Sequence, residues 1–148
     1  MTKEVLLKIQ GMQFMEAEGE PVEVFTAGNY FQKNGKHYIK YDEATEGFQE
    51  TTQNLIKISG DTMEVTKRGL TNVHMVFQEK KKNLSYYNTP FGNLMVGIEA
   101  SNIEVKEEPD ELEVRVDYTL DINYERLADC TIQMNIQSKG VKEARLLG

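Results

Sequence analysis

Apolar and polar side chains alternate with a period of two along most of the chain, and no segment keeps the 3.6-residue apolar period of an amphipathic helix. The clearest run covers residues 112–124, where every second side chain is apolar or aromatic and those between are polar. Alternation of this kind predicts a long strand with one buried face. The chain is therefore predicted to be all-β.

Turn signals between these runs can be tested, because a hairpin fixes a register and a wrong register sets apolar residues opposite polar ones. Asn34-Gly35 is the strongest two-residue hairpin signal, and it pairs Tyr30 with Ile39 and Phe31 with Tyr38. Across Gly60-Asp61 the expected pairs are Ile58 with Met63 and Ile56 with Val65, and across Ser101-Asn102 the expected pair is Ile98 with Val105. Across Pro109-Asp110 they are Val105 with Val114 and Ile103 with Val116. A turn near Arg126 is expected to pair Ile122 with Cys130, Leu120 with Ile132 and Tyr118 with Met134.

The most motif-like stretch, Thr-Pro-Phe-Gly at 89–92, also reads as a turn. Pro90 suits the second position of a type I turn, and Gly92 suits the left-handed residue of a G1 bulge. This register pairs Tyr86 with Val96 and Leu84 with Ile98, and sets Tyr87 opposite Met95. Turn geometry does not require an apolar ring at Phe91, so that side chain is predicted to cap one end of the structure.

These hairpins join about ten or eleven antiparallel strands, each beside the next. The expected spans are 3–13, 22–33, 36–44, 50–59, 61–68, 71–78, 83–89, 93–100, 103–108, 111–124 and 127–138. An open sheet of this size would expose two edges, so closure is favoured. The prediction is a single up-and-down antiparallel β-barrel of the lipocalin or calycin type, with a domain over 1–140 and a poorly ordered tail over 141–148.

Charge and composition narrow the function classes. The net charge of −7 disfavours binding to nucleic acids and to anionic membranes, because proteins that bind these surfaces need clustered Lys and Arg side chains. A single cysteine excludes an intramolecular disulfide, and no stretch has the roughly 20 apolar residues of a membrane helix. We therefore expect a cytoplasmic protein.

The ordered segments YIKYDE, KRGL, MVF, YYNTPFG and VDYTLDIN resemble the YwiB-like family of uncharacterised bacterial lipocalin-like β-barrels. The resemblance covers about residues 3–138. Its most specific element is Tyr87-x-Thr89-Pro90-x-Gly92, supported by Tyr41-x-Glu43 and Arg68-Gly69. It implies a calycin-type barrel and no established activity.

Two features depart from better-known calycins. The chain has no Trp, which the Gly-x-Trp signature of lipocalins requires. Fatty-acid-binding barrels use an Arg-x-Tyr pair to hold a carboxylate, but Arg115 and Tyr118 are three residues apart and fall on opposite faces of a strand. That carboxylate site is therefore not expected here.

Catalytic and metal-binding patterns are absent from the sequence. His37 and His74 are the only histidines and are expected to be ordinary strand residues. Cys130 falls on an apolar face and is expected to be an inert, buried thiol. No nucleophile elbow, P-loop or dinucleotide motif is present. We expect no enzymatic activity, no cofactor and no metal.

Glu43 is the carboxylate that the alternation places inward, opposite Thr26. A buried carboxylate needs a partner or stays protonated. Arg68 is the expected partner, provided that a bulge at Arg68-Gly69 turns it inward. The alternatives are that Glu43 is exposed at a barrel rim, or that the pair is purely structural.

Tyrosines supply the remaining polar groups of the predicted interior. The candidate lining of a ligand site is Tyr30, Tyr41, Glu43, Arg68, Tyr86, Tyr118 and Tyr124. Buried hydroxyls among apolar side chains are typical of small-molecule sites, so one hypothesis is a barrel that binds an apolar or amphipathic ligand. The alternative is a filled barrel that acts as an interaction or structural module, for example a homodimer. Its outward apolar patch would contain Phe25, Phe31, Tyr38, Tyr87 and Met95.

Overall fold

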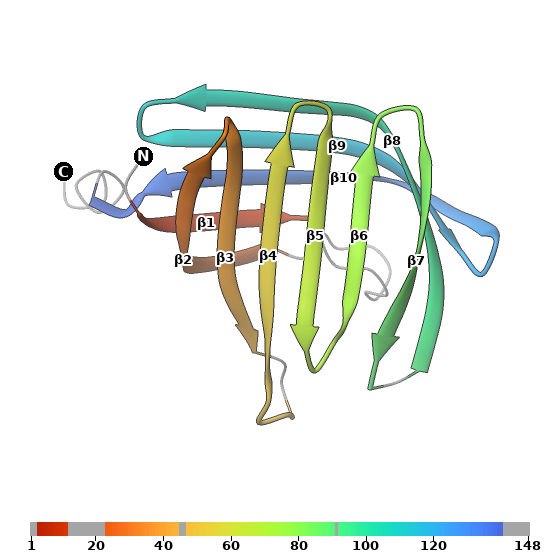
Figure 1. Cartoon of the computed structure of the whole chain (residues 1–148). Helices are drawn as coiled ribbons and strands as arrows, with labels where there is room; N and C mark the ends of the chain where they lie inside the picture. The colour runs from red at the N-terminus through yellow and green to blue at the C-terminus, as the bar shows by residue number, and fades with distance from the viewer. Residues whose placement is uncertain (1–2, 12–22, 45–46, 91, 141–148) are drawn as a thin grey trace.

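The computed structural model describes residues 3–11, 23–44, 47–90 and 92–140, and these residues form ten strands (Figure 1). The strands are β1 (Glu4–Gln10), β2 (Glu23–Lys33), β3 (Lys36–Ala44), β4 (Thr51–Ser59), β5 (Thr62–Gly69), β6 (Val73–Gln78), β7 (Lys82–Thr89), β8 (Gly92–Glu108), β9 (Glu111–Ile122) and β10 (Glu125–Ser138). The predicted all-β architecture is confirmed.

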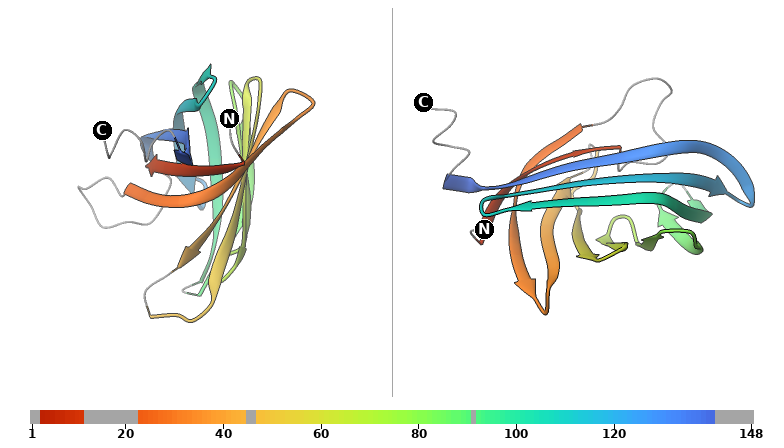
Figure 2. Two further views of the ribbon diagram at one scale, coloured as in Figure 1. Left: turned by 90° about the vertical axis from the view of Figure 1, so that its left-hand side faces the viewer. Right: turned by 90° about the horizontal axis from the view of Figure 1, so that it is seen from above.

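The strands form one antiparallel sheet in the order β6-β5-β4-β3-β2-β1-β10-β9-β8-β7. Its two ends meet where Asn72 and Asn88 exchange two backbone hydrogen bonds of 2.9 Å each. The sheet is therefore a nearly closed up-and-down barrel. Figure 2 shows its two layers, with the long strands β8–β10 on one side and β3–β6 on the other.

Three predicted hairpin registers are confirmed. Tyr30 lies opposite Ile39, Ile56 opposite Val65, and the β8–β9 hairpin pairs Val105 with Val114. Asn34 and Gly35 both have positive φ angles, of 54° and 75°, as a two-residue turn of this type requires. The short turns at Asn34-Gly35, Gly60-Asp61 and Pro109-Asp110 therefore fix these registers locally.

The predicted turn at Ser101-Asn102 is wrong, because β8 continues through it as one strand of 17 residues. A bulge between Ala100 and Asn102 absorbs the irregularity while β9 continues alongside. Paired backbone groups on the facing strand thus outweigh the local turn preference of two polar residues.

The predicted register of the β7–β8 hairpin is wrong by one residue. Gly92 lies directly opposite Thr89, so the loop has two residues instead of three, and Tyr86 lies opposite Met95. A one-residue slip exchanges the two faces of a strand. Tyr87 is consequently directed inward and Tyr86 outward. Phe91 lies outside the described residues, and its predicted capping role with it.

The turn between β9 and β10 lies at Asn123 and Tyr124, which have φ angles of 50° and 70°, and not near Arg126. A bulge between Arg126 and Ala128 then sets Tyr118 opposite Cys130. The expected partner of Tyr118, Met134, lies an even number of residues from the observed partner Cys130. An even shift keeps a side chain on the same face of the strand, so Tyr118 is inward as predicted. Tyr124, in contrast, lies in the exposed turn.

The core is made by the inward side chains of all strands except β7, whose Tyr87 packs against it from the side. Phe77 is its largest fully buried side chain, and its ring meets the Tyr118 ring edge-on with centroids 5.1 Å apart. No helix in the described part of the chain is long and apolar enough to cross a membrane.

Candidate functional site

The inner faces of β3, β4 and β5 change from apolar to polar toward one end of the barrel. The cross-strand registers place nine residues in three successive layers: Ile39, Ile56 and Val65; then Tyr41, Asn54 and Lys67; then Glu43, Thr52 and Gly69. The first layer is completely buried. We call Tyr41, Glu43, Thr52, Asn54 and Lys67 the polar cluster.

Lys67 is the centre of the polar cluster. Its side chain is only 4% exposed, and its Nζ lies 3.1 Å from Glu43 Oε1 and 2.8 Å from Asn54 Oδ1. A buried ammonium needs such partners, since isolation would cost several kcal/mol. Two of its three N–H groups are thereby used, and within the described residues the third has no acceptor.

Tyr41 lies opposite Asn54, which in turn lies opposite Lys67, and Tyr41 is 5% exposed. Its hydroxyl makes no hydrogen bond to any part of the chain that the structure describes. Burial raises the pKa of Tyr41, and the Glu43 carboxylate raises this pKa further. The hydroxyl therefore stays protonated and keeps a donor to offer.

Tyr87 of β7 faces the same carboxylate. Burial and, to a smaller extent, Glu43 raise the pKa of Tyr87 to about 12.

Asn54 and Thr52 have more of their hydrogen-bonding groups paired, because Asn54 Nδ2 donates to the Thr52 carbonyl oxygen and the Thr71 amide donates to Thr52 Oγ1. Within the polar cluster, unused hydrogen-bonding capacity is thus concentrated on Tyr41, Glu43 and Lys67, whereas the fully buried side-chain atom without a partner in the described residues is Asn83 Nδ2 on β7.

The predicted partner of Glu43 was wrong. Arg68 is exposed and directed outward, because β5 keeps its alternation through Lys67 and needs no bulge. Lys67 shares its face with Met63 and Val65, so the same two-residue period could have identified it. The prediction missed Lys67 because a lysine on an apolar face is rare.

The five candidate tyrosines are divided by the structure. Tyr30, Tyr41 and Tyr118 are buried, whereas Tyr86 and Tyr124 are 70% and 76% exposed and do not line the interior. The register slip of β7 explains the exposure of Tyr86, and the two-residue turn explains that of Tyr124. The hydroxyl of Tyr118 donates to the Gly11 carbonyl oxygen at 3.4 Å, far from the polar cluster in the sheet order.

A second buried polar pair lies at the opposite end of β3. The Tyr30 hydroxyl lies 2.7 Å from His37 Nδ1, and His37 Nε2 lies 3.7 Å from Glu107 Oε2. Burial, and then Glu107, raise the pKa of Tyr30, so the phenol stays protonated, and the tautomer of His37 decides which of the two atoms donates. His37 therefore has a specific buried partner that its classification as an ordinary strand residue did not foresee.

The predicted outward patch is only partly assembled. Phe25 and Phe31 are exposed on β2, and the Phe31 ring stacks on Tyr38 with centroids 4.6 Å apart. Tyr87 instead packs inside, and Met95 lies on β8, which β1, β10 and β9 separate from β2. The assembled part of the predicted patch is therefore the Phe31–Tyr38 pair, and Phe25 lies six residues away from Phe31 along β2, opposite Lys8.

Cys130 is half-buried, and burial raises the pKa of its thiol. It does not contribute to the polar cluster. In the part of the chain that the structure describes, no group of His, Cys, Asp and Glu side chains is arranged to hold a metal ion.

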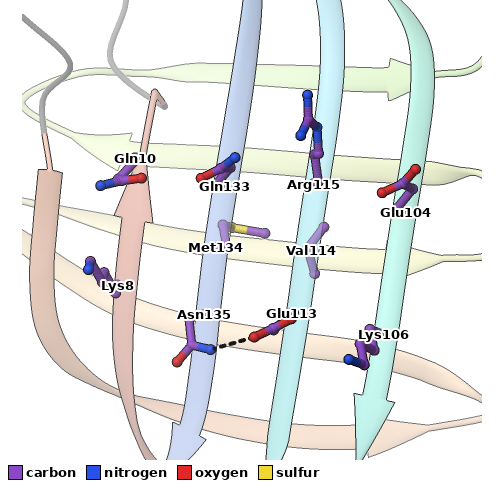
Figure 3. Close-up of a pocket in the computed structure, with 10 residues that line it drawn as sticks. All are labelled: Lys8, Gln10, Glu104, Lys106, Glu113, Val114, Arg115, Gln133, Met134 and Asn135. Atoms are coloured by element: carbon purple, nitrogen blue, oxygen red, sulfur yellow. Dashed lines mark hydrogen bonds between the residues drawn. The ribbon is translucent and has the colours of Figure 1, made fainter.

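A groove of about 450 Å³ crosses the outer surface of β1, β10, β9 and β8 (Figure 3). Its side chains carry both charges, including Lys8, Arg115 and Glu104, and Asn135 Nδ2 donates to Glu113 Oε1 at 3.4 Å. Most of these side chains are exposed, so water can satisfy them. The polar cluster is the stronger candidate because its polar groups are withdrawn from water.

Comparison with known proteins agrees with this architecture. A solved structure described as the crystal structure of the ywiB protein from Bacillus subtilis matches with a TM-score of 0.73 and 18% identity over 92% of each chain. At this identity the similarity shows the shared fold alone. No curated protein matches the chain significantly. Residues 7–134 match the family described as "Domain of unknown function (DUF1934)", and the chain therefore belongs to this family.

Proposed function

We propose that this barrel binds a small molecule whose polar group reaches the polar cluster. The observation that carries the proposal is Tyr41, a buried residue whose hydroxyl makes no hydrogen bond to the described residues. Among the described residues the fully buried side-chain atom without a partner is Asn83 Nδ2, so solvent reaches the Tyr41 hydroxyl. A ligand that replaces this solvent would gain a hydrogen bond beside apolar side chains. The proposed activity is binding and not catalysis.

The surroundings of Tyr41 support a binding role over a purely structural one. Replacing a buried ion pair such as Lys67–Glu43 by apolar side chains is often neutral or stabilising, so stability alone does not explain its presence. The pair lies next to the apolar layer of Ile39, Ile56 and Val65. A few polar groups beside apolar side chains are typical of small-molecule sites.

Native mass spectrometry of the protein purified from its own cells tests this proposal. We expect a bound mass on the wild type, and about five- to tenfold weaker retention in Tyr41→Phe, since a hydrogen bond in a largely buried site contributes about 1–1.5 kcal/mol. Tyr38→Phe is the matched control, because its ring stacks on the outer surface. A wild type without bound mass, together with an ordered water on Tyr41 in a crystal structure, would contradict the proposal.

A second candidate function is a homodimeric interaction module. The exposed Phe25 and the stacked Phe31–Tyr38 pair favour it, because aromatic side chains are enriched in protein interfaces. The same mass spectra test this alternative. A dimer that dissociates in Phe31→Ser would support it, and a monomer at all concentrations would exclude it.

A further inference from the structure

The charge of the polar cluster restricts which molecules it accepts. Lys67 contributes one positive charge and Glu43 one negative charge, and their atoms lie 3.1 Å apart. Arg68 and Asp42, the charged neighbours along the chain, are exposed on the outer face. A ligand group that reaches this pair therefore meets a site that is already electrically balanced.

The unused hydrogen-bonding groups of the polar cluster include both donors and an acceptor. Lys67 keeps one N–H donor and Tyr41 keeps its O–H donor, while Glu43 Oε2 makes no hydrogen bond to the described residues and is an acceptor. A matching ligand group must accept from Lys67 or Tyr41 and donate to Glu43. A carboxylate cannot donate, and an ammonium cannot accept.

Resting on the proposed function, we infer that the cluster recognises a neutral carboxamide group, whose carbonyl oxygen and N–H₂ lie side by side. The carbonyl accepts from Lys67 or Tyr41, and the amide N–H donates to Glu43. A charged group of either sign would bring a second like charge against one member of a partly buried pair, where water screens charges less than at the open surface.

Three probes with the same alkyl chain test this inference: hexanamide, hexanoate and hexylammonium, each titrated at neutral pH into ¹⁵N-labelled protein followed by NMR. Hexanamide is expected to shift the backbone amides around Tyr41, Asn54 and Lys67 and to bind at least about tenfold more tightly than either ion. Tighter binding of either ion would overturn the carboxamide class and leave the proposed function intact. Failure of all three probes would also overturn it, while a retained mass in the native spectra would still support binding.

Charge-changing variants provide a readout that a structural role would not produce. Glu43→Gln leaves Lys67 uncompensated and should reverse the preference toward hexanoate. Lys67→Gln leaves Glu43 uncompensated and should reverse it toward hexylammonium. The neighbouring exposed residues supply matched controls, Asp42→Asn and Arg68→Gln, in which hexanamide should remain preferred.

Thermal unfolding of each variant guards against loss of the fold. Glu43 is only partly buried, so Glu43→Gln is the variant that keeps the test decisive if Lys67→Gln does not fold. A folded Glu43→Gln protein with an unchanged preference for hexanamide would contradict the inference.

Discussion

The barrel buries polar side chains at both ends of β3, and the two sets differ in how completely they satisfy each other. At the hairpin end, the Tyr30 hydroxyl and His37 Nδ1 form a hydrogen bond of 2.7 Å. At the other end, Lys67 binds Glu43 and Asn54, but the Tyr41 hydroxyl next to them has no hydrogen bond in the described part of the chain. Both tyrosines are about equally buried.

This difference separates two uses of a buried hydroxyl. A buried hydroxyl that is hydrogen-bonded within the protein stabilises the fold, whereas one without a protein partner depends on solvent or a ligand for its hydrogen bond. We therefore interpret the Tyr30–His37 pair as structural and the polar cluster as a site with capacity left for a ligand.

The largest expected effect comes from removing one charge of the cluster. Glu43→Ala leaves the Lys67 ammonium buried without its counter-ion and should lower the free energy of unfolding by about 3 kcal/mol. Glu107→Ala at the other end should cost less than about 1 kcal/mol, because Glu107 is 54% exposed. Urea denaturation measures both, and equal losses would remove the distinction between the two ends.

A double variant tests whether the loss of stability comes from the unpaired Lys67 charge. Glu43→Gln with Lys67→Met removes both charges, and most of the stability lost in Glu43→Ala should return. If the double variant were as unstable as the single one, the ion pair would be needed for folding itself.

An intermediate effect is expected from the two matched Tyr→Phe changes. Tyr30→Phe leaves His37 Nδ1 buried without its hydrogen-bond partner and should cost about 1–3 kcal/mol. Tyr41→Phe removes a hydroxyl without a protein partner and should change stability by less than about 0.5 kcal/mol. A loss at Tyr41 as large as that at Tyr30 would show that its hydroxyl is satisfied after all.

The smallest effect concerns alkaline pH. The pKa of Tyr87 is about 12 in the folded state, above the value of roughly 10 in an unfolded chain, so the folded state holds this proton more tightly. Its contribution to stability is complete below about pH 10 and is lost as the pH rises toward 12.

Glu43 distinguishes the two ends in this titration. Glu43→Gln should lower the pKa values of Tyr41 and Tyr87 and leave that of Tyr30 unchanged, because Glu107 acts on Tyr30 instead. NMR of ¹³C-tyrosine-labelled protein follows each phenol separately. A shift at Tyr30 of the same size would contradict this assignment of the two carboxylates.

Local signals predicted much of the fold. The two-residue turns Asn34-Gly35 and Gly60-Asp61 fixed the β2–β3 and β4–β5 registers, because such turns permit few backbone conformations. Errors occurred where two local solutions were similar in energy. A two-residue and a three-residue loop after Thr89 differ by one position, and that position decided which of Tyr86 and Tyr87 is buried.

The candidate site was predicted less completely than the fold. Alternation correctly placed Tyr41 on the inner face and also contained the signal for Lys67, but it could not show which side chains remain without partners. That depends on long-range pairing.

The amino-acid sequence by itself determined the all-β class, the strand count to within one and the inward position of Tyr41, because the two-residue period and short turns act over only a few residues. Only the tertiary structure decided that β1 pairs with β10, that β6 and β7 nearly close the barrel, and that Lys67 meets Glu43 from 24 residues away. These contacts join distant parts of the chain, and their geometry depends on the strand registers of the entire barrel.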